Sequence, residues 1–155
     1  MMNDVSFDTL TAQTIPDFSG VWQLNLEKST FRGSPPREIV STIQHREPIL
    51  TQTTRVVAAD GGERQWTFTF DTSGSDSTNT TAAGDVQSRA HWNGSELVID
   101  SVLRTPGRTF HFTDHWSLSH DGRTLTMAHP DDDLAGQVAI LEKASPDPAA
   151  RFTRE

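Results

Sequence analysis

Two residues in the second half of the chain, Asp114 and His129, could act together as a general acid–base pair. Asp114 lies between Phe112 and Trp116 in an alternating run, so we expect its carboxylate on the apolar face of a strand. Burying an unpaired carboxylate is costly, which predicts a partner. A turn at Asp121-Gly122 would place His129 directly opposite Asp114. The carboxylate would then hold the imidazole in one tautomer for proton transfer, and a purely structural pair is the alternative.

Metal and cofactor sites are poorly supported by the other polar residues. His111 and His115 are four residues apart on one predicted strand, about 13 Å of rise, which is too far to chelate one ion together. The chain has no Cys, which excludes thiolate ligands and disulfides. The run Asp131–Asp133 lacks the alternate spacing of a calcium loop. We therefore expect neither a metal nor a cofactor.

Large apolar residues on the predicted inner strand faces indicate a second kind of site, a cavity for a small hydrophobic molecule. Small β-barrels can hold one ligand, and ligand pockets are lined mainly by apolar and aromatic side chains with a few polar groups. A barrel filled by its own core is the alternative interpretation. The candidate ligand-binding residues are Gln52, Thr54, Trp66, Phe68, Phe70, Phe110, Phe112, Trp116 and Met127.

These candidates belong to short alternating runs that predict an all-β meander. The chain has 155 residues, which fits one domain, and only 34% are hydrophobic. Much of the remainder is Thr, a β-branched residue that favours strands, so each strand carries about one apolar residue in two. The predicted strands are residues 20–26, 38–45, 49–57, 64–71, 77–82, 85–92, 95–104, 109–118, 124–129 and 137–143.

Turn residues predict how these strands pair. Asn93-Gly94 and Asp121-Gly122 suit two-residue turns whose central residues need positive φ. Asp60–Gly62 is interpreted as a three-residue loop, and Glu47-Pro48 as a two-residue turn. The apolar residues then share one face of each hairpin. The predicted cross-strand partners are Trp92 with Ser95, Val56 with Trp66, Trp116 with Met127, and His45 with Leu50.

A meander with consistent faces is expected to close into a barrel, because closure removes exposed sheet edges. With ten strands, the first and last strands run antiparallel and can pair. The weak strand at 77–82 is kept for this reason, since nine strands would require a parallel closure.

The segment Asp17–Ser29, DFSGVWQLNLEKS, resembles the start of bacterial lipocalin-like domains. It is similar, more distantly, to the Phe-x-Gly-x-Trp start of the calycins, the superfamily of lipocalins and fatty-acid-binding proteins. The hairpins Trp92–Leu97 and Ser119–Leu125 also resemble the bacterial pattern. The resemblance covers about residues 16–144. It implies a single up-and-down antiparallel β-barrel of 8–10 strands with an internal cavity.

The resemblance also implies that a basic residue of the last strand, Lys143, covers Trp22 at the closed end of the barrel. The chain departs from fatty-acid-binding proteins in two respects. The segment Glu27–Arg37 contains Gly33-Ser34-Pro35-Pro36, which cannot form their helix-turn-helix lid. The chain has no Tyr, so their Arg-x-Tyr carboxylate clamp is missing.

The formal net charge of −8 argues against nucleic-acid binding, which needs a basic surface. No run approaches the ~20 apolar residues of a membrane span. The first residues lack a signal-peptide pattern, so we expect a cytoplasmic protein, although a leader already removed would leave the same sequence. We expect a monomer or homodimer with a flexible arm (residues 1–16), a barrel (17–145) and a flexible tail (146–155).

Two functions remain open from the sequence, besides a structural domain with a filled barrel. The first is a binding protein that holds a small hydrophobic molecule, aromatic or polycyclic, inside the barrel. The second is a cofactor-free cyclase, isomerase or dehydratase of natural-product metabolism. In that case the barrel walls would fold an apolar substrate, and Asp114 with His129 would move a proton.

Overall fold

A computed structural model describes residues 15–129 and 136–144. These residues form ten β-strands and no helix, which confirms the predicted all-β fold. Most of the predicted arm, the whole tail and the Asp131–Asp133 run lie outside the described residues. The strands are β1 (Gly20–Leu24), β2 (Glu38–Arg46), β3 (Ile49–Val57), β4 (Glu63–Asp71), β5 (Asp76–Thr80), β6 (Asp85–Asn93), β7 (Glu96–Thr105), β8 (Arg108–Leu118), β9 (Thr124–His129) and β10 (Gln137–Lys143).

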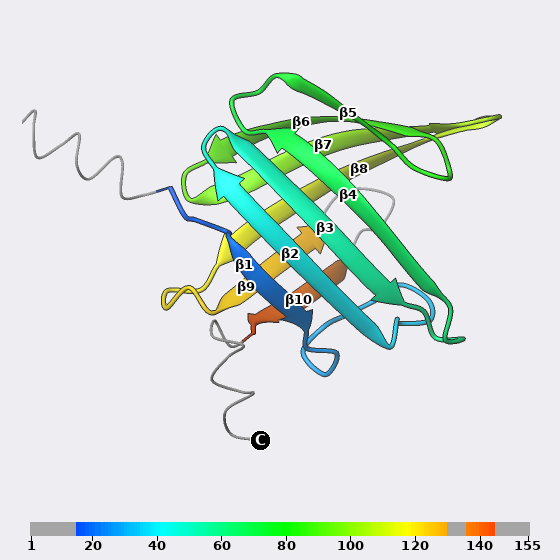
Figure 1. The fold of residues 1–155 in the computed structure, drawn as a ribbon, viewed down its shortest axis with the longest axis horizontal. Coiled ribbons are helices and arrows are strands. Elements are labelled where there is room, and N and C mark those ends of the chain that lie inside the picture. Colours follow the sequence, from blue (N-terminus) through cyan, green and yellow to red (C-terminus); the bar gives the residue numbers. More distant parts are fainter. Residues whose placement is uncertain (1–14, 130–135, 145–155) are drawn as a thin grey trace, which may run out of the picture.

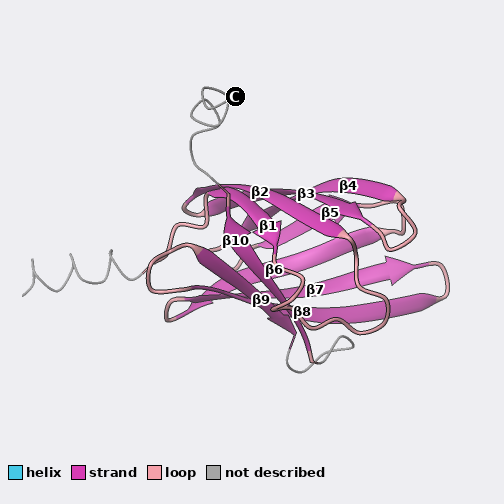
Figure 2. Ribbon diagram, turned by 90° about the horizontal axis from the view of Figure 1, so that it is seen from below, coloured by secondary structure: helices cyan, strands magenta, loops and turns pink. Residues whose placement is uncertain are grey.

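The ten strands form one antiparallel sheet that curls into a nearly closed barrel (Figures 1 and 2). The strand order is β4-β3-β2-β1-β10-β9-β8-β7-β6-β5. The first and last strands pair antiparallel, with Trp22 opposite Lys143. This confirms the predicted pairing of the two ends of the meander. The edges of the sheet lie at β4 and β5 instead.

The seam between β4 and β5 is joined by side chains instead of a backbone ladder. The Thr69 N–H donates to Asn79 Oδ1 at 3.0 Å, and Asn79 Nδ2 donates to the Thr69 carbonyl at 3.1 Å. The Asp71 N–H donates to Ser77 Oγ at 3.2 Å. The β5 sequence, DSTNT, contains no apolar side chain that could anchor the strand in the core. The predicted closure of the meander therefore stops short at this seam.

Two predicted registers are wrong by two residues. Trp92 lies opposite Leu97, and Val56 lies opposite Arg64. An offset of two residues keeps every side chain on its predicted face, because side chains alternate with a period of two. The inner and outer faces are therefore as predicted. The sequence predicts Ser95 and Trp66 at these two places.

The turns themselves explain both offsets. The predicted β6–β7 turn has Asn93-Gly94 at its centre. In the structure Asn93 pairs with Glu96, so the central residues are Gly94 and Ser95, with Gly94 at a φ of +66°. The β3–β4 loop has five residues, Ala58–Gly62, and is closed by a bond from the Ala58 N–H to the Gly62 carbonyl. The other two predicted registers are confirmed. They pair Trp116 with Met127, and His45 with Leu50.

The hydrophobic core fills the end of the barrel at which the chain enters β1, called the closed end below. Phe18 and Trp22 are fully buried there, and Trp22 Nε1 donates to the Phe18 carbonyl at 2.9 Å. Lys143 Nζ lies 5.6 Å from the centroid of the Trp22 ring, which confirms the expected cation–π contact. Gly20 has a φ of +142°, and a Cβ at this position would lie 2.8 Å from Lys143 Cε. A side chain at position 20 would require Lys143 to shift from its place over the indole.

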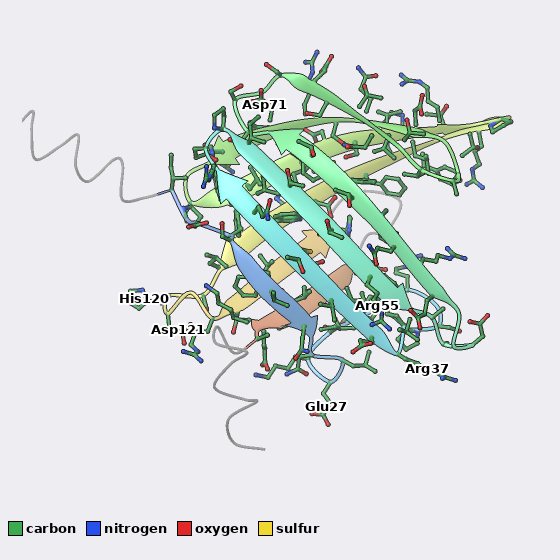
Figure 3. All side chains as sticks on the ribbon, viewed as in Figure 1. Glu27, Arg37, Arg55, Asp71, His120 and Asp121 are labelled. Carbon is green, nitrogen blue, oxygen red and sulfur yellow. The ribbon has the colours of Figure 1, made fainter. Side chains whose placement is uncertain are left out.

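The opposite end of the barrel, called the open end below, carries the β3–β4 hairpin. Figure 3 shows Arg55 near the end of β3 and Arg37 beside it, far from Asp71 at the end of β4. Arg37 Nε donates to the Ala59 carbonyl at 3.0 Å, which ties the start of β2 to the β3–β4 hairpin. Neighbouring strands are antiparallel, so successive turns alternate between the two ends of the barrel. The turns after β3, β5 and β7 lie at the open end, and those after β2, β4 and β6 lie at the closed end.

Candidate functional site

A cavity of about 820 Å³ occupies the part of the barrel that the core leaves unfilled. Its walls include Arg64 and Trp66 from the start of β4, and residues 80–83 from the end of β5 and the β5–β6 turn. These segments lie at the open end. Pockets for small molecules commonly measure about 300–1,000 Å³, so the cavity has room for a ligand of that class. The aromatic residues of the inner faces therefore do not fill the barrel completely.

Seven of the nine predicted ligand-binding residues line this cavity. Aromatic rings come from two opposite walls, β4 and β8, and the remainder from β3 and β9. Phe68 and Phe70 pack edge to face, with ring centroids 5.9 Å apart, and Phe70 packs edge to face on Trp116 at 6.2 Å. The seven lining residues are Gln52, Trp66, Phe68, Phe70, Phe112, Trp116 and Met127.

The other two predicted residues, Thr54 and Phe110, do not line the cavity. Thr54 is buried, and its Oγ1 lies 2.9 Å from Ser41 Oγ, so the hydroxyl is used within the wall. Phe110 lies nearer the end of the β7–β8 hairpin. Its ring stacks on Phe112 at 6.3 Å and carries the Arg108 guanidinium at 4.5 Å. The alternation places both residues on the inner face but does not show where along the strand the cavity stops.

The two predicted catalytic residues lie together in the cavity wall. Asp114 Oδ1 is 3.1 Å from His129 Nε2, and both residues line the cavity. The side chain of His129 is 11% exposed and that of Asp114 is 28% exposed. The register from the Asp121-Gly122 turn brings them together, as the sequence predicts. A carboxylate in contact with an imidazole on a cavity wall is an arrangement that suits proton transfer.

A buried donor without an acceptor lies beside this pair. Trp116 is 2% exposed, and its indole N–H is the single buried side-chain polar atom without a hydrogen bond in the part of the chain that the structure describes. Leaving such a group unpaired costs about 1–3 kcal/mol. Gln52, on another wall, donates from Nε2 to Ser41 Oγ at 3.3 Å. The cavity thus combines aromatic and aliphatic walls with polar groups from several strands.

Sequence reasoning missed one side of the cavity. Gln65 and Thr67 belong to the outer face of β4, yet both line the cavity. The cavity therefore reaches the outer surface beside β4, where the edge of this strand has no hydrogen-bonded neighbour strand. Alternation with Trp66 could have predicted Arg64 on the inner face, whereas the gap at the seam had no sequence signal. The lining residues that were not among the candidates are Arg64, Gln65, Thr67, Thr80, Thr81, Ala82, Ala83, Val86, Ser101 and Leu103.

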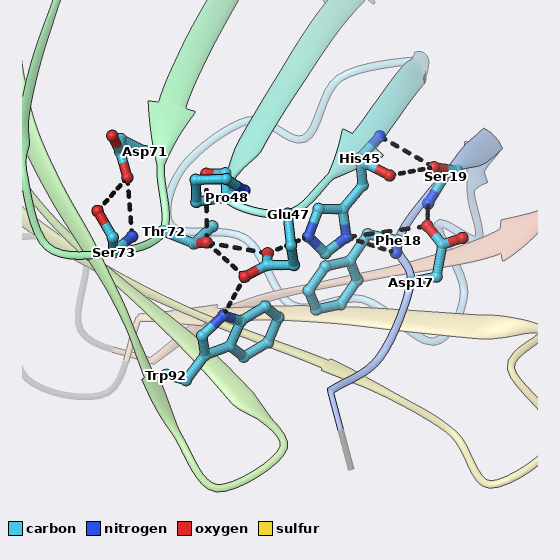
Figure 4. Close-up of polar contacts among 10 residues, drawn as sticks. All are labelled: Asp17, Phe18, Ser19, His45, Glu47, Pro48, Asp71, Thr72, Ser73 and Trp92. Carbon is cyan, nitrogen blue, oxygen red and sulfur yellow. Dashed lines mark hydrogen bonds and ion pairs between the residues drawn. The ribbon is translucent and has the colours of Figure 1, made fainter. Parts of the chain in front are cut away.

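A second polar cluster lies at the closed end, away from the cavity (Figure 4). The Phe18 N–H donates to His45 Nδ1 at 3.2 Å, so the other ring nitrogen, Nε2, donates to Glu47. Glu47 also accepts from Thr72 Oγ1 at 2.8 Å and from Trp92 Nε1 at 3.0 Å. Burial alone would raise the pKa of Glu47, but these hydrogen bonds outweigh it and hold the pKa below its ordinary value. This cluster joins three turns and the N-terminal segment, which is a structural role.

The remaining histidines do not gather into a metal site. His115 lies on the outer face, and its Nδ1 is 3.0 Å from Glu96 Oε1. Within the described ranges, no group of three or more His, Cys, Asp or Glu side chains is arranged to hold a metal ion. The same residues contain no helix with the length and apolar character needed to cross a membrane.

No protein-family model matches this chain, and no curated protein matches it.

Proposed function

We propose that this barrel binds a small apolar molecule in its cavity. The observation that carries the proposal is the 820 Å³ space itself, walled by aromatic rings at the open end while the core fills the closed end. A barrel that served only as a structural domain would gain stability by filling this space, because voids cost packing energy. The exposed indole of Trp66, 36% accessible, is consistent with a wall that a ligand covers.

The same proposal includes a lipocalin-like assignment within the calycins. It is supported by the resemblance of Asp17–Ser29 and by the ten-stranded meander whose ends pair. It is also supported by the contact of Lys143 with Trp22 at the closed end. Barrels of this class hold their ligands inside, with polar groups that fix the orientation of an otherwise apolar molecule.

Binding of Nile red, a neutral apolar dye, tests the proposal by its fluorescence. We expect saturable binding of one dye per barrel, and at least a ten-fold loss of affinity in Met127→Trp, which fills part of the cavity. Thr126→Trp on the outer face of the same strand is the matched control and should bind as the parent does. Absence of saturable binding, or equal affinity in both variants, would contradict the proposal.

A second candidate function is proton transfer on a bound ketone, and the Asp114–His129 pair favours it. His129 would take a proton from the carbon next to the carbonyl, leaving an enolate. After the imidazolium exchanges its proton with solvent, it would return one to the same carbon and become neutral again. In D₂O, 1-tetralone should then exchange its C2 protons for deuterium faster with the protein than in buffer. The rate should fall to that of buffer in His129→Gln while the ketone still binds. Exchange unaffected by this substitution would rule out the pair as the base.

A further inference from the structure

Asp114 has a carboxylate oxygen that no other described residue binds. Its Oδ1 lies 3.1 Å from His129 Nε2, and this contact is its one ion pair among the described residues. Its Oδ2 accepts no hydrogen bond from them, and it is not an enclosed atom, since Trp116 Nε1 is the single enclosed side-chain polar atom without a partner there. The Asp114 side chain is 28% exposed and lines the cavity. A ligand in the cavity can therefore reach this second oxygen.

Aromatic rings line the cavity on both sides of Asp114. Phe112 and Trp116 lie two residues before and after it on the same face of β8, each about 7 Å away along the strand. Phe70, on the opposite wall, packs on Trp116, and Phe68 packs on Phe70. The faces of aromatic rings carry partial negative charge and attract cations. The carboxylate and the rings near it thus favour the same kind of ligand group.

The other charged groups of the cavity do not compensate this carboxylate. Among the described lining residues, Asp114 is the one acid and Arg64 is the one Lys or Arg. Arg64 is exposed near the start of β4, at the open end, and it forms no ion pair with Asp114. Solvent screens an exposed charge of this kind. A neutral His129 leaves the negative charge of its partner in place, and the net charge of −8 of the whole chain also attracts cations.

The charge of a ligand decides how it interacts with Asp114 Oδ2. A hydrocarbon that covered this oxygen would remove its water and replace it with nothing, which is costly. A ligand carboxylate would bring a like charge into a partly desolvated site. A protonated amine would instead donate a charge-assisted hydrogen bond, which is stronger than a bond from a neutral hydroxyl.

We infer that the cavity selects apolar amines in their protonated form, with the ammonium group beside Asp114 and the apolar part against the aromatic walls. This inference rests on the proposed function, since it specifies the class of ligand for the same cavity. It distinguishes such amines from hydrocarbons, from neutral alcohols and from carboxylates such as fatty acids.

The test compares four compounds with one bicyclic skeleton: tetralin, 1-tetralol, 1,2,3,4-tetrahydro-1-naphthylamine and 1,2,3,4-tetrahydro-1-naphthoate. Their affinities are measured by displacement of Nile red at pH 8, where the amine is protonated and an ordinary imidazole is neutral. We expect the amine to bind at least ten-fold more tightly than tetralin and than the carboxylate, with the alcohol between the amine and tetralin. This order is measured on the parent protein and needs no variant.

Asp114→Asn removes the charge while it keeps the shape of the side chain. In this variant the affinity for the amine should fall to about that for the alcohol, and the affinity for tetralin should change little. Asp100→Asn, on the exposed outer face of β7, is the control. It changes the net charge by the same amount and should leave all four affinities unchanged. In about 0.5 M NaCl, which screens surface charges, the preference of the parent for the amine should persist.

The outcomes separate the inference from the proposed function. An amine that binds no more tightly than the alcohol would overturn the inference and leave the proposed function standing. A preference for the amine that Asp114→Asn retains, or that salt abolishes, would also overturn it and would indicate attraction to the net charge of the chain. Tightest binding of the carboxylate would overturn it and would indicate Arg64 as the anchor. Failure of all four compounds, and of Nile red itself, would overturn both.

Discussion

The carboxylate of Asp114 and the imidazole of His129 meet across two neighbouring strands, with Oδ1 3.1 Å from Nε2. Neither side chain is fully exposed, and both face the cavity instead of the outer surface. The pair is the most direct link between the sequence pattern of this barrel and the chemistry it could support. The contact also links β8 to β9, because the two side chains come from neighbouring strands.

Breaking this pair should lower the stability of the fold by a moderate amount. His129→Gln removes the imidazole beside a carboxylate that is still partly accessible, so we expect a loss of about 0.5–1.5 kcal/mol in the free energy of unfolding. Urea denaturation measures it. His111→Gln, on the exposed outer face, is the control and should change stability by less than about 0.5 kcal/mol. Equal effects of both substitutions would show that the pair contributes nothing.

Gly20 and Lys143 should be energetically coupled. Gly20→Ala imposes a side chain at a φ of +142° and places Cβ against Lys143 Cε, so we expect a loss of about 1–3 kcal/mol. Lys143→Ala removes the obstructing atom and the contact with Trp22. In that background the steric part of the cost disappears and only the backbone strain remains. A double-mutant cycle by urea denaturation checks this, and an identical cost in both backgrounds would contradict the packing described.

The β4–β5 seam should loosen when its side-chain bonds are removed. Asn79→Ala deletes both hydrogen bonds to the backbone of Thr69, so the Thr69 amide should exchange with solvent at least ten-fold faster. Asn79→Asp keeps an acceptor for that amide and should preserve much of the protection. The Val98 amide, in the middle of β7, serves as an internal reference and should not change. Unaltered exchange at Thr69 in Asn79→Ala would mean that the seam is held by other contacts.

Glu47 should make the closed end sensitive to acid. Its pKa is lower in the folded protein than the ordinary value of 4.5, so its stabilisation is present above that value and is lost as the pH falls through the folded pKa. Glu47→Gln should therefore cost about 1–2 kcal/mol at pH 7, a range reduced for the exposure of the carboxylate, and progressively less below pH ~4.5.

The control for Glu47 is Glu27→Gln, an exposed carboxylate in the β1–β2 loop. It should change stability by less than about 0.5 kcal/mol at every pH. Stability measured by urea denaturation between pH 3 and 7 separates the two variants. A difference between the parent and Glu47→Gln that stays constant over this range would contradict the role of the ionised Glu47.

Much of this fold could be predicted from the sequence, because alternation fixes the face of each residue. Asp114 lies inside because its neighbours Phe112 and Trp116 do, and the Asp121-Gly122 turn then selects His129 as its partner. The register offsets at Trp92 and Val56 leave the predicted faces unchanged, since a shift of two residues keeps each side chain on the same face of its strand. Face and partner are thus local properties that spacing and turn residues determine.

The missing parts depend on contacts between distant segments. The gap at the β4–β5 seam follows from how strongly the whole sheet curls, which no single strand determines. For this reason Gln65 and Thr67 line the cavity despite their outward position. The cluster around His45 and Glu47 joins turns far apart in the sequence, and the pattern of β2 gives no sign of it. The extent of the cavity along β8, which includes Phe112 but not Phe110, also depends on contacts between distant segments.

Methyl NMR of the methionines tests the central claim, ligand binding in the cavity, most directly. The chain contains three methionines, and Met127, on β9, lines the cavity. With ¹³C-methyl methionine, the Met127 signal is assigned by its loss in Met127→Leu. Titration with 1-tetralone should shift this signal saturably, with nuclear Overhauser contacts to the ligand. A Met127 signal that remains unchanged up to the solubility limit of the ketone, and with Nile red, would contradict the account.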